Sequence, residues 1–391
     1  MYARQINKTE NIKWNSKSDF EREWDILCSL FLFFGLRLTK KKSDGISESI
    51  KDILFKILWI SLLILSCYSL VNSLYVIFIG EEKRRSLIYL ISVFSAFATK
   101  CSIWKKKSDI ANGVSKLSLF FEQLKNCDRS SLKSWLMILS SLIIINFMFT
   151  ASCLWTVFDG SRFLFGATLD DSSTSHAVRT IMKYITILNA CVAITFAYTT
   201  LLLCSFVYIN EKALISNWNK MAKESLREDC QPALIRQSVF LLVRMAQVIK
   251  SLNRDLSQAN LCAICILVAN VFEAMIDIVY HESLTTIFFG FSLVCGSTSA
   301  FVFVCLVIYA SNVRKEFTTV KVSLCDEITR NHLIFKDCSR AMNANIFLAT
   351  LDNVSPNFVI SGMRMFEYQR GIILTTFGCA VTYGVLFIKM E

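Results

Sequence analysis

Seven long apolar runs divide this sequence, and they constrain its fold more than any other feature. A helix needs about 20 residues to cross the hydrocarbon core of a bilayer, and each run is about that long or longer. The runs cover 52–79, 86–104, 135–158, 182–209, 260–280, 284–310 and 371–388. Only helices and closed barrels satisfy backbone hydrogen bonds in lipid, and these runs lack the strict alternation of a barrel strand. The sequence therefore predicts an all-α membrane protein with seven transmembrane helices.

Three local features qualify this assignment. Lys56 and Lys100 lie near the ends of the first and second runs, so we expect their stems to carry the ammonium groups to the headgroups. The stretch ILCSLFLFFGL, at 26–36, is too short to span a membrane and is typical of an interfacial or re-entrant helix.

The basic residues give the orientation. Of the 42 Lys and Arg residues, 33 lie in the segments 1–51, 105–134, 210–259 and 311–370, and 7 lie in or at the ends of the segments on the opposite side. Cytoplasmic loops carry the excess of Lys and Arg in membrane proteins. We therefore expect the N-terminus in the cytoplasm and the C-terminus outside, and the net charge of +11 is a topological signal.

The two longest inner segments, 210–258 and 311–370, are mixed in composition, and the first repeats apolar residues at helical spacing. Structureless loops of this length are uncommon, so we expect cytoplasmic extensions of the membrane helices. Helices lying on the membrane surface are the alternative. An apolar stripe in the extensions requires a partner, either within the subunit or from a neighbouring one.

The sequence contains few of the residue patterns that indicate an enzyme. His176 and His281 are expected outside and His332 inside, so the three histidines cannot converge on one metal. This excludes the histidine cluster of the seven-span adiponectin-receptor-like hydrolases. The chain also has no Gly-rich phosphate loop and no Gly-x-Ser-x-Gly elbow. We predict neither an enzyme nor a cofactor or metal site.

One acidic pair, Glu273 and Asp277, lies four residues apart on one helix face in the outer half of the fifth run. Intramembrane carboxylates are costly and often functional, which favours an outward-opening ligand cavity. Pairing with Arg179 or Lys183, or exposure of Asp277 at the interface, is the structural alternative. Three further residues toward the outer ends of the runs are candidates to line such a cavity: Trp155, Tyr184 and Thr286. An interfacial aromatic belt accounts equally for the aromatic ones.

The last run carries a stripe of small and polar residues at helical spacing. Its opposite side carries Ile373, Phe377, Val381 and Leu386. Small residues permit close helix packing, which is one interpretation. The other is a pore at a symmetry axis, favoured by a cation at the end of the stripe. The stripe comprises Gly371, Thr375, Gly378, Thr382, Val385 and Lys389.

The C-terminal sequence resembles a known family. TYGVLFIKM, at 382–390, is similar to the Thr-Tyr, five hydrophobics, Gln-Phe signature that ends insect gustatory receptors. The resemblance covers about the last thirty-five residues, and length and topology agree with it over the whole chain. Lys389 and Met390 depart from it, because they replace the Gln and the Phe. The matching positions are Pro356, Phe358, Gly362, Arg370, Gly378, Thr382 and Tyr383.

This resemblance implies a ligand-gated, non-selective cation channel in the plasma membrane. It implies a homo- or heterotetramer that binds a small-molecule tastant or metabolite in the outer half of each bundle. The implied organisation is a cytoplasmic N-terminal segment with an interfacial helix at 1–51, a six-helix ligand-binding bundle at 52–310, a helical anchor at 311–370 and a pore-lining helix at 371–391. The implied pore-lining residues are Thr375, Gly378, Thr382, Val385, Lys389 and Met390.

Alternatives remain at this point. A ring of lysines at Lys389 would repel cations, and Glu391 could neutralise it; alternatively, Lys389 extends to the outer headgroups. A G-protein-coupled receptor also has seven spans, but it requires an outside N-terminus. A transporter or a non-conducting receptor subunit is a further alternative.

Overall fold

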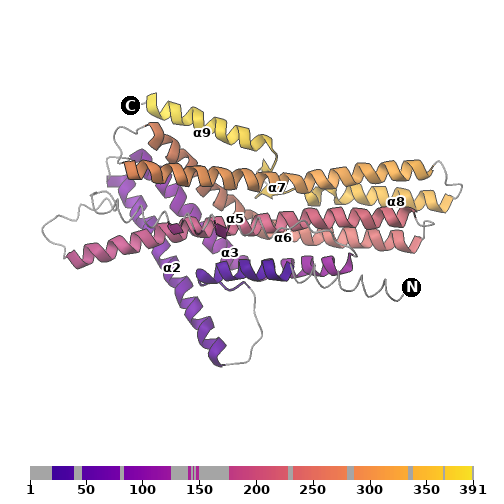
Figure 1. Ribbon diagram of the computed structural model, residues 1–391, viewed down its shortest axis with the longest axis horizontal. Coiled ribbons are helices and arrows are strands. Elements are labelled where there is room, and N and C mark those ends of the chain that lie inside the picture. The colour runs from indigo at the N-terminus through magenta and orange to yellow at the C-terminus, as the bar shows by residue number, and fades with distance from the viewer. Residues whose placement is uncertain are drawn as a thin grey trace.

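The computed structural model of the chain describes residues 20–38, 46–79, 83–124, 140–141, 144, 147–148, 176–227, 232–279, 286–332, 338–363 and 366–389. Almost all of this part of the chain is helical (Figure 1). After an N-terminal helix at 20–33, the helices are α2 Ile46–Ile79, α3 Lys83–Gln123, α5 His176–Arg227, α6 Pro232–Val279, α7 Thr286–His332, α8 Cys338–Val354 and α9 Gly371–Lys389. A 3₁₀ turn, η2 Ser355–Phe358, and a two-stranded hairpin of β1 Ser361–Gly362 and β2 Phe366–Glu367 precede α9.

Six of the seven apolar runs coincide with helices, and the third, 135–158, lies largely outside the described residues. Within the described part of the chain, four helical stretches are long and apolar enough to cross a membrane. These are Ile50–Val71, Cys191–Leu226, Ala233–Ile276 and Ser292–Arg330, and a shorter apolar stretch covers Gly371–Thr382. The predicted all-helical class is therefore confirmed.

The three longest helices, α5, α6 and α7, have 52, 48 and 47 residues. Each continues well beyond its apolar run, as predicted, but the end of the segment 311–370 forms η2 and the hairpin and not a helical extension of the last run. At the right-hand end of Figure 1 these extensions lie beside α8. Trp218 of α5 is fully buried there, stacks on Phe347 of α8 with a centroid distance of 6.0 Å, and donates from its indole nitrogen to the Ser238 carbonyl. At Trp218 the extensions therefore pack on one another and on α8 within the subunit, whereas Phe240 and Val322 of the extensions are exposed.

The short apolar stretch at 26–36 forms part of the helix at 20–33 and docks on the bundle. Phe31 is fully buried and meets Phe196 of α5 edge-on at 5.8 Å, whereas Phe33 is 63% exposed. Gly35 ends the stretch with φ +75, and a Cβ atom there would lie 2.6 Å from the Phe55 carbonyl oxygen. A glycine is needed because it alone adopts this φ without strain and permits this approach. One face of the predicted interfacial helix therefore packs against the interior of the protein.

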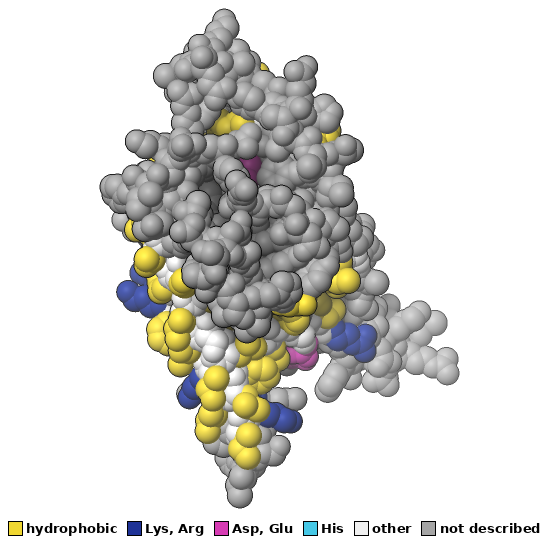
Figure 2. All heavy atoms as spheres, turned by 90° about the vertical axis from the view of Figure 1, so that its left-hand side faces the viewer, with side chains coloured by type: hydrophobic (Ala, Val, Ile, Leu, Met, Phe, Trp, Pro, Cys, Tyr) yellow, Lys and Arg dark blue, Asp and Glu magenta, His cyan; other side chains and the backbone are white. Residues whose placement is uncertain are grey.

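Helix α2 presents most of its apolar side chains outward, as expected of a helix that faces lipid. Figure 2 shows yellow hydrophobic side chains along the helix that projects at the bottom of the view. Its exposed large residues include Ile50, Ile53, Leu54, Ile57, Ile60, Ile64 and Val71. Its inner face instead carries Trp59, Leu62 and hydroxyl residues, which are buried against α3 and α5.

Candidate functional site

The helix α9 and its attachment form the part of the structure that carries the family-like motif. Phe358, in η2, is fully buried and stacks on Phe317 of α7 with a centroid distance of 4.2 Å. Gly362 pairs with Phe366 across the hairpin, and Met363 turns the chain with φ 49. The motif residues at 356–362 thus have a structural task, because they fold the chain back so that α9 can begin beside α7.

Two polar contacts fix the base of α9 on α7. Arg370, just before the helix, donates from Nη2 to Asn312 Oδ1 at 3.2 Å. Arg314 of α7 forms an ion pair with Glu367 of β2, and Gln369 also donates to that carboxylate at 3.1 Å. The start of α9 is therefore tied to α7, while the rest of the helix depends on apolar contacts.

Those apolar contacts involve one narrow side of α9. Ala380 is buried, Ile373 and Phe377 are half-buried, and the Phe377 ring meets Phe303 of α7 at 6.4 Å. Val381, which the helical pattern placed on the same side as Phe377, is 49% exposed. Leu374 is 79% exposed. Much of the circumference of α9 is thus left uncovered by the residues that the structure describes.

The small and polar stripe lies on this uncovered part. Gly371, Thr375, Gly378 and Thr382 are all exposed, and a Cβ atom at either glycine would meet nothing within 4 Å among the described residues. Thr375 donates its hydroxyl to the Gly371 carbonyl at 3.1 Å. Close packing against the described part of the subunit therefore does not account for the stripe. Val385, Lys389 and Tyr383 belong to α9 but their side chains are not described, and Met390 lies outside the described residues.

The predicted ligand residues are only partly placed. Glu273 of α6 is exposed, and Tyr184 of α5 is 52% exposed. Asp277 and Thr286 lie in α6 and α7 without described side chains, and Trp155 lies outside the described residues. Ala274, the residue after Glu273, contacts Gly296 of α7 so closely that a Cβ atom at Gly296 would lie 2.3 Å from the Ala274 Cβ.

A buried polar contact joins α5, α6 and α7 and was not predicted from the sequence. The Ser299 hydroxyl lies 2.8 Å from the Tyr198 hydroxyl and receives a hydrogen bond of 3.1 Å from the Asn270 amide. All three side chains are buried. Asn270 and Ser299 stand within the fifth and sixth apolar runs, so a search for uncharged polar residues in those runs could have found them.

Lys100 was expected to extend to the headgroups, and this expectation is wrong. Its side chain is 1% exposed, and its ammonium donates to Ser66 of α2 at 2.7 Å. One turn further along α2, Asn189 of α5 donates to the Ser69 hydroxyl. The Ser66 hydroxyl of α2 provides an acceptor for the ammonium inside the bundle, so it need not reach the surface.

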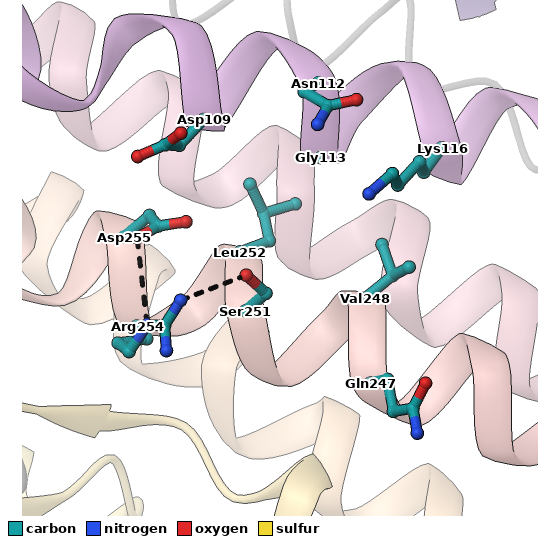
Figure 3. A pocket seen from close by; sticks show the side chains of 10 residues that line it. All are labelled: Asp109, Asn112, Gly113, Lys116, Gln247, Val248, Ser251, Leu252, Arg254 and Asp255. Carbon is teal, nitrogen blue, oxygen red and sulfur yellow. Dashed lines mark hydrogen bonds and ion pairs between the residues drawn. The ribbon is translucent and has the colours of Figure 1, made fainter.

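A polar cavity of about 300 Å³ lies between α3 and α6, outside the apolar runs of both helices. Figure 3 shows Leu252 pointing across its centre toward Gly113, with Asp109 and Lys116 on α3 and Arg254 on α6. Lys106 bridges the helices nearby through an ion pair of 3.0 Å with Asp255, and this hydrogen-bonded carboxylate raises the pKa of Lys106. None of the predicted ligand residues lines this cavity.

Solved structures with the same fold are known. The chain is similar to the insect olfactory receptor OR5 from Machilis hrabei in complex with eugenol, with a TM-score of 0.70, 12% identity, and coverage of 95% of this chain and 100% of that one. The structure of the same receptor that is described without eugenol matches with the same TM-score and identity, and 98% of it is covered. No protein-family model and no curated protein matches the sequence.

The architecture is thus that of a helical membrane protein. More particularly, the chain has the fold of the insect olfactory receptor OR5, and this fold agrees with the one that the resemblance of the C-terminal residues implies.

Proposed function

We propose that this chain is a subunit of a gustatory-receptor-like chemoreceptor that acts as a ligand-gated, non-selective cation channel in the plasma membrane. The α9 helices of several copies, four by the family resemblance, surround the pore. Its ligand is a small-molecule tastant or metabolite, bound in the outer half of the bundle. The N-terminus lies in the cytoplasm, where the extensions of α5, α6 and α7 together with α8 anchor the assembly.

The observation that carries this proposal is the exposure of the α9 stripe. Helix α9 uses Ile373, Phe377 and Ala380 to pack on its own subunit, and leaves Gly371, Thr375, Gly378 and Thr382 uncovered. In lipid a threonine hydroxyl can bond only within its own helix, as Thr375 does with Gly371, whereas a water-filled axis also hydrates it. A pore shared by several copies is therefore the environment that fits the stripe best.

A ligand near Glu273 would lie above the buried contact of Tyr198, Ser299 and Asn270, which joins the three helices that frame the outer bundle. Binding there would shift the equilibrium toward an open state by its differential affinity for the two states. The eugenol bound to the OR5 receptor provides a first probe.

A cysteine at Thr382 tests the channel directly. The background carries Cys379→Ser, because Cys379 is exposed on the same helix. Cells expressing Thr382→Cys are clamped while sugars, alkaloids and eugenol are applied in turn, and a positively charged methanethiosulfonate then follows from outside. We expect the reagent to abolish most of the agonist current, because a fixed cation in the pore repels the permeant cations.

The matched control is Ala380→Cys on the packed side of the same helix, where the native residue is 1% exposed. Its current should survive the reagent. Equal inhibition of both variants, or no inhibition of either, would contradict a pore along the stripe. A chain that yields no current with any agonist or partner subunit would favour the non-conducting alternative.

A further inference from the structure

The contact between α5 and α6 buries a carboxyl group just beyond the apolar run 182–209. Glu211 of α5 is 0% exposed. Its Oε2 atom receives one long hydrogen bond of 3.4 Å from the Asn253 amide of α6. Its Oε1 atom is buried and has no hydrogen-bond partner among the described residues. An ionised carboxylate normally accepts several hydrogen bonds, so this environment fits a neutral acid far better.

The electrostatic surroundings agree with this geometry. Among the described residues, no Lys or Arg nitrogen lies within the 4.0 Å ion-pair limit of Glu211. Burial raises the pKa of the Glu211 carboxyl well above its ordinary value of 4.5, and the Asn253 amide lowers it only in part.

The neighbouring side chains offer no counter-charge. Cys204 and Tyr208, on α5, are the titratable groups that interact with the Glu211 carboxyl. Among the charged residues of this part of α6, the side chains of Lys250 and Arg254 are exposed, and Asp255 forms an ion pair with Lys106 of α3.

The same interface leads to the hairpin before α9. One turn before Glu211, the Tyr208 hydroxyl accepts a hydrogen bond of 2.8 Å from the Asn260 amide of α6. Asn260 in turn interacts with Tyr368, which is 3% exposed and whose backbone amide donates to the Ile360 carbonyl at 3.0 Å. Three residues after Tyr368, α9 begins. Separation of α5 from α6 at Glu211 would therefore disturb the hairpin that holds α9.

We propose that Glu211 is a proton-binding switch: its neutral form locks α5 on α6, and its ionisation loosens the Tyr208–Asn260–Tyr368 contacts that hold the hairpin before α9. An ionised carboxylate requires water or a cation, and no Lys or Arg among the described residues pairs with Glu211. The carboxyl must then move outward or admit water, and both routes part the two helices.

The effect of pH on this interface follows from the fact that Glu211 is an acid, which is neutral when it carries its proton. The folded chain binds a proton at Glu211 that the unfolded chain releases near pH 4.5, so this group makes folding less favourable as the pH rises above that value. Above about pH 4.5 the loosened form releases the proton that the locked form keeps, so the ratio of loosened to locked interface rises about tenfold per pH unit until the locked form itself ionises. If the chain lies with this interface in the cytoplasm, cytosolic acid favours the locked form. That link to gating depends on the proposed function, whereas the protonation itself does not.

The test uses the full-length protein in lipid nanodiscs and requires no ligand. Infrared difference spectra between low and high pH should show the carbonyl stretch of a buried carboxylic acid. This band should be absent from Glu211→Gln, which keeps the shape of the neutral acid, and retained in Glu224→Gln, which alters an exposed Glu of the same helix. Removal of the Asn253 hydrogen bond by Asn253→Ala should move the loss of the band to higher pH.

Hydrogen exchange of the peptide 360–372 measures the mechanical consequence. Above about pH 4.5, the ratio of wild-type to Glu211→Gln exchange should grow by up to about tenfold per pH unit, until Glu211 ionises in the locked form as well. The intrinsic rate of amide exchange changes with pH equally in the wild type and the variant, so it cancels in this ratio. A carboxylic acid band that persists in Glu211→Gln, or a pH-independent ratio, would overturn the proposal. Both readouts are independent of channel activity, so failure of the channel proposal would leave them unaffected.

Discussion

The ammonium of Lys100 on α3 donates a hydrogen bond of 2.7 Å to the hydroxyl of Ser66 on α2, and both side chains are buried. An ammonium group has three donors, and this hydroxyl is its only hydrogen-bond acceptor among the described residues. We therefore expect Ser66→Ala to destabilise the protein by about 1–3 kcal/mol, because it leaves a buried polar group unsatisfied.

Thermal unfolding in detergent measures this effect. Lys100→Met in the Ser66→Ala background should restore most of the loss, since an apolar side chain of similar length needs no acceptor. An unchanged melting temperature in Ser66→Ala would show that the hydroxyl does not serve the ammonium.

The close contact of α6 and α7 at Gly296 gives a second prediction. A Cβ atom at this position would lie 2.3 Å from the Ala274 Cβ, so Gly296→Ala should force the helices apart and cost about 1–3 kcal/mol. Ala274→Gly in the same chain removes the clashing atom and should recover much of the stability. The comparison of the two melting temperatures is the measurement, and failure of the double variant to recover would refute this packing.

The ion pair of Arg314 and Glu367 tethers the hairpin before α9 to α7. Both side chains are nearly half exposed, so we expect Glu367→Gln to cost less than about 1 kcal/mol of stability. Hydrogen exchange of residues 366–380 should nevertheless increase, because the tether holds the start of α9. The charge-reversed pair Arg314→Glu with Glu367→Arg should restore slow exchange, and an equal increase in the reversed pair would show that the charges do not interact.

Lys389 bears on conduction through the proposed pore. Four lysines at the outer end of α9 should reduce cation permeability, and Lys389→Gln should raise both the cation conductance and the ratio of cation to anion permeability. Reversal potentials in asymmetric salt measure that ratio. An unchanged ratio would favour the alternative in which Lys389 extends to the headgroups.

The helices were predictable because apolar length is a local property of the sequence. The runs at 52–79, 182–209, 260–280 and 284–310 needed no knowledge of their neighbours, and all four lie in helices. The stripe on α9 was also predictable, since the spacing of Gly371, Thr375, Gly378 and Thr382 defines one helix face. That this face is uncovered required the structure, because exposure depends on which residues the rest of the bundle supplies.

Lys100 shows where local reading fails. The position of Lys100 near the end of an apolar run does not determine how deeply its side chain is buried. Helix α3 continues to Gln123, and the Ser66 hydroxyl of α2 accepts a hydrogen bond from the ammonium. The polar contacts of Tyr198 with Ser299 and of Tyr208 with Asn260 join residues far apart in the chain. Their pairing depends on the register between helices, which no single apolar pattern determines.

Disulfide cross-linking of Thr382→Cys in the Cys379→Ser background tests most directly whether the α9 stripes of several copies face one another. In native membranes treated with a mild oxidant, we predict bands of two subunits linked through position 382, and almost none for Ala380→Cys on the packed side. Monomeric Thr382→Cys, or equal cross-linking at both positions, would contradict a pore lined by this helix.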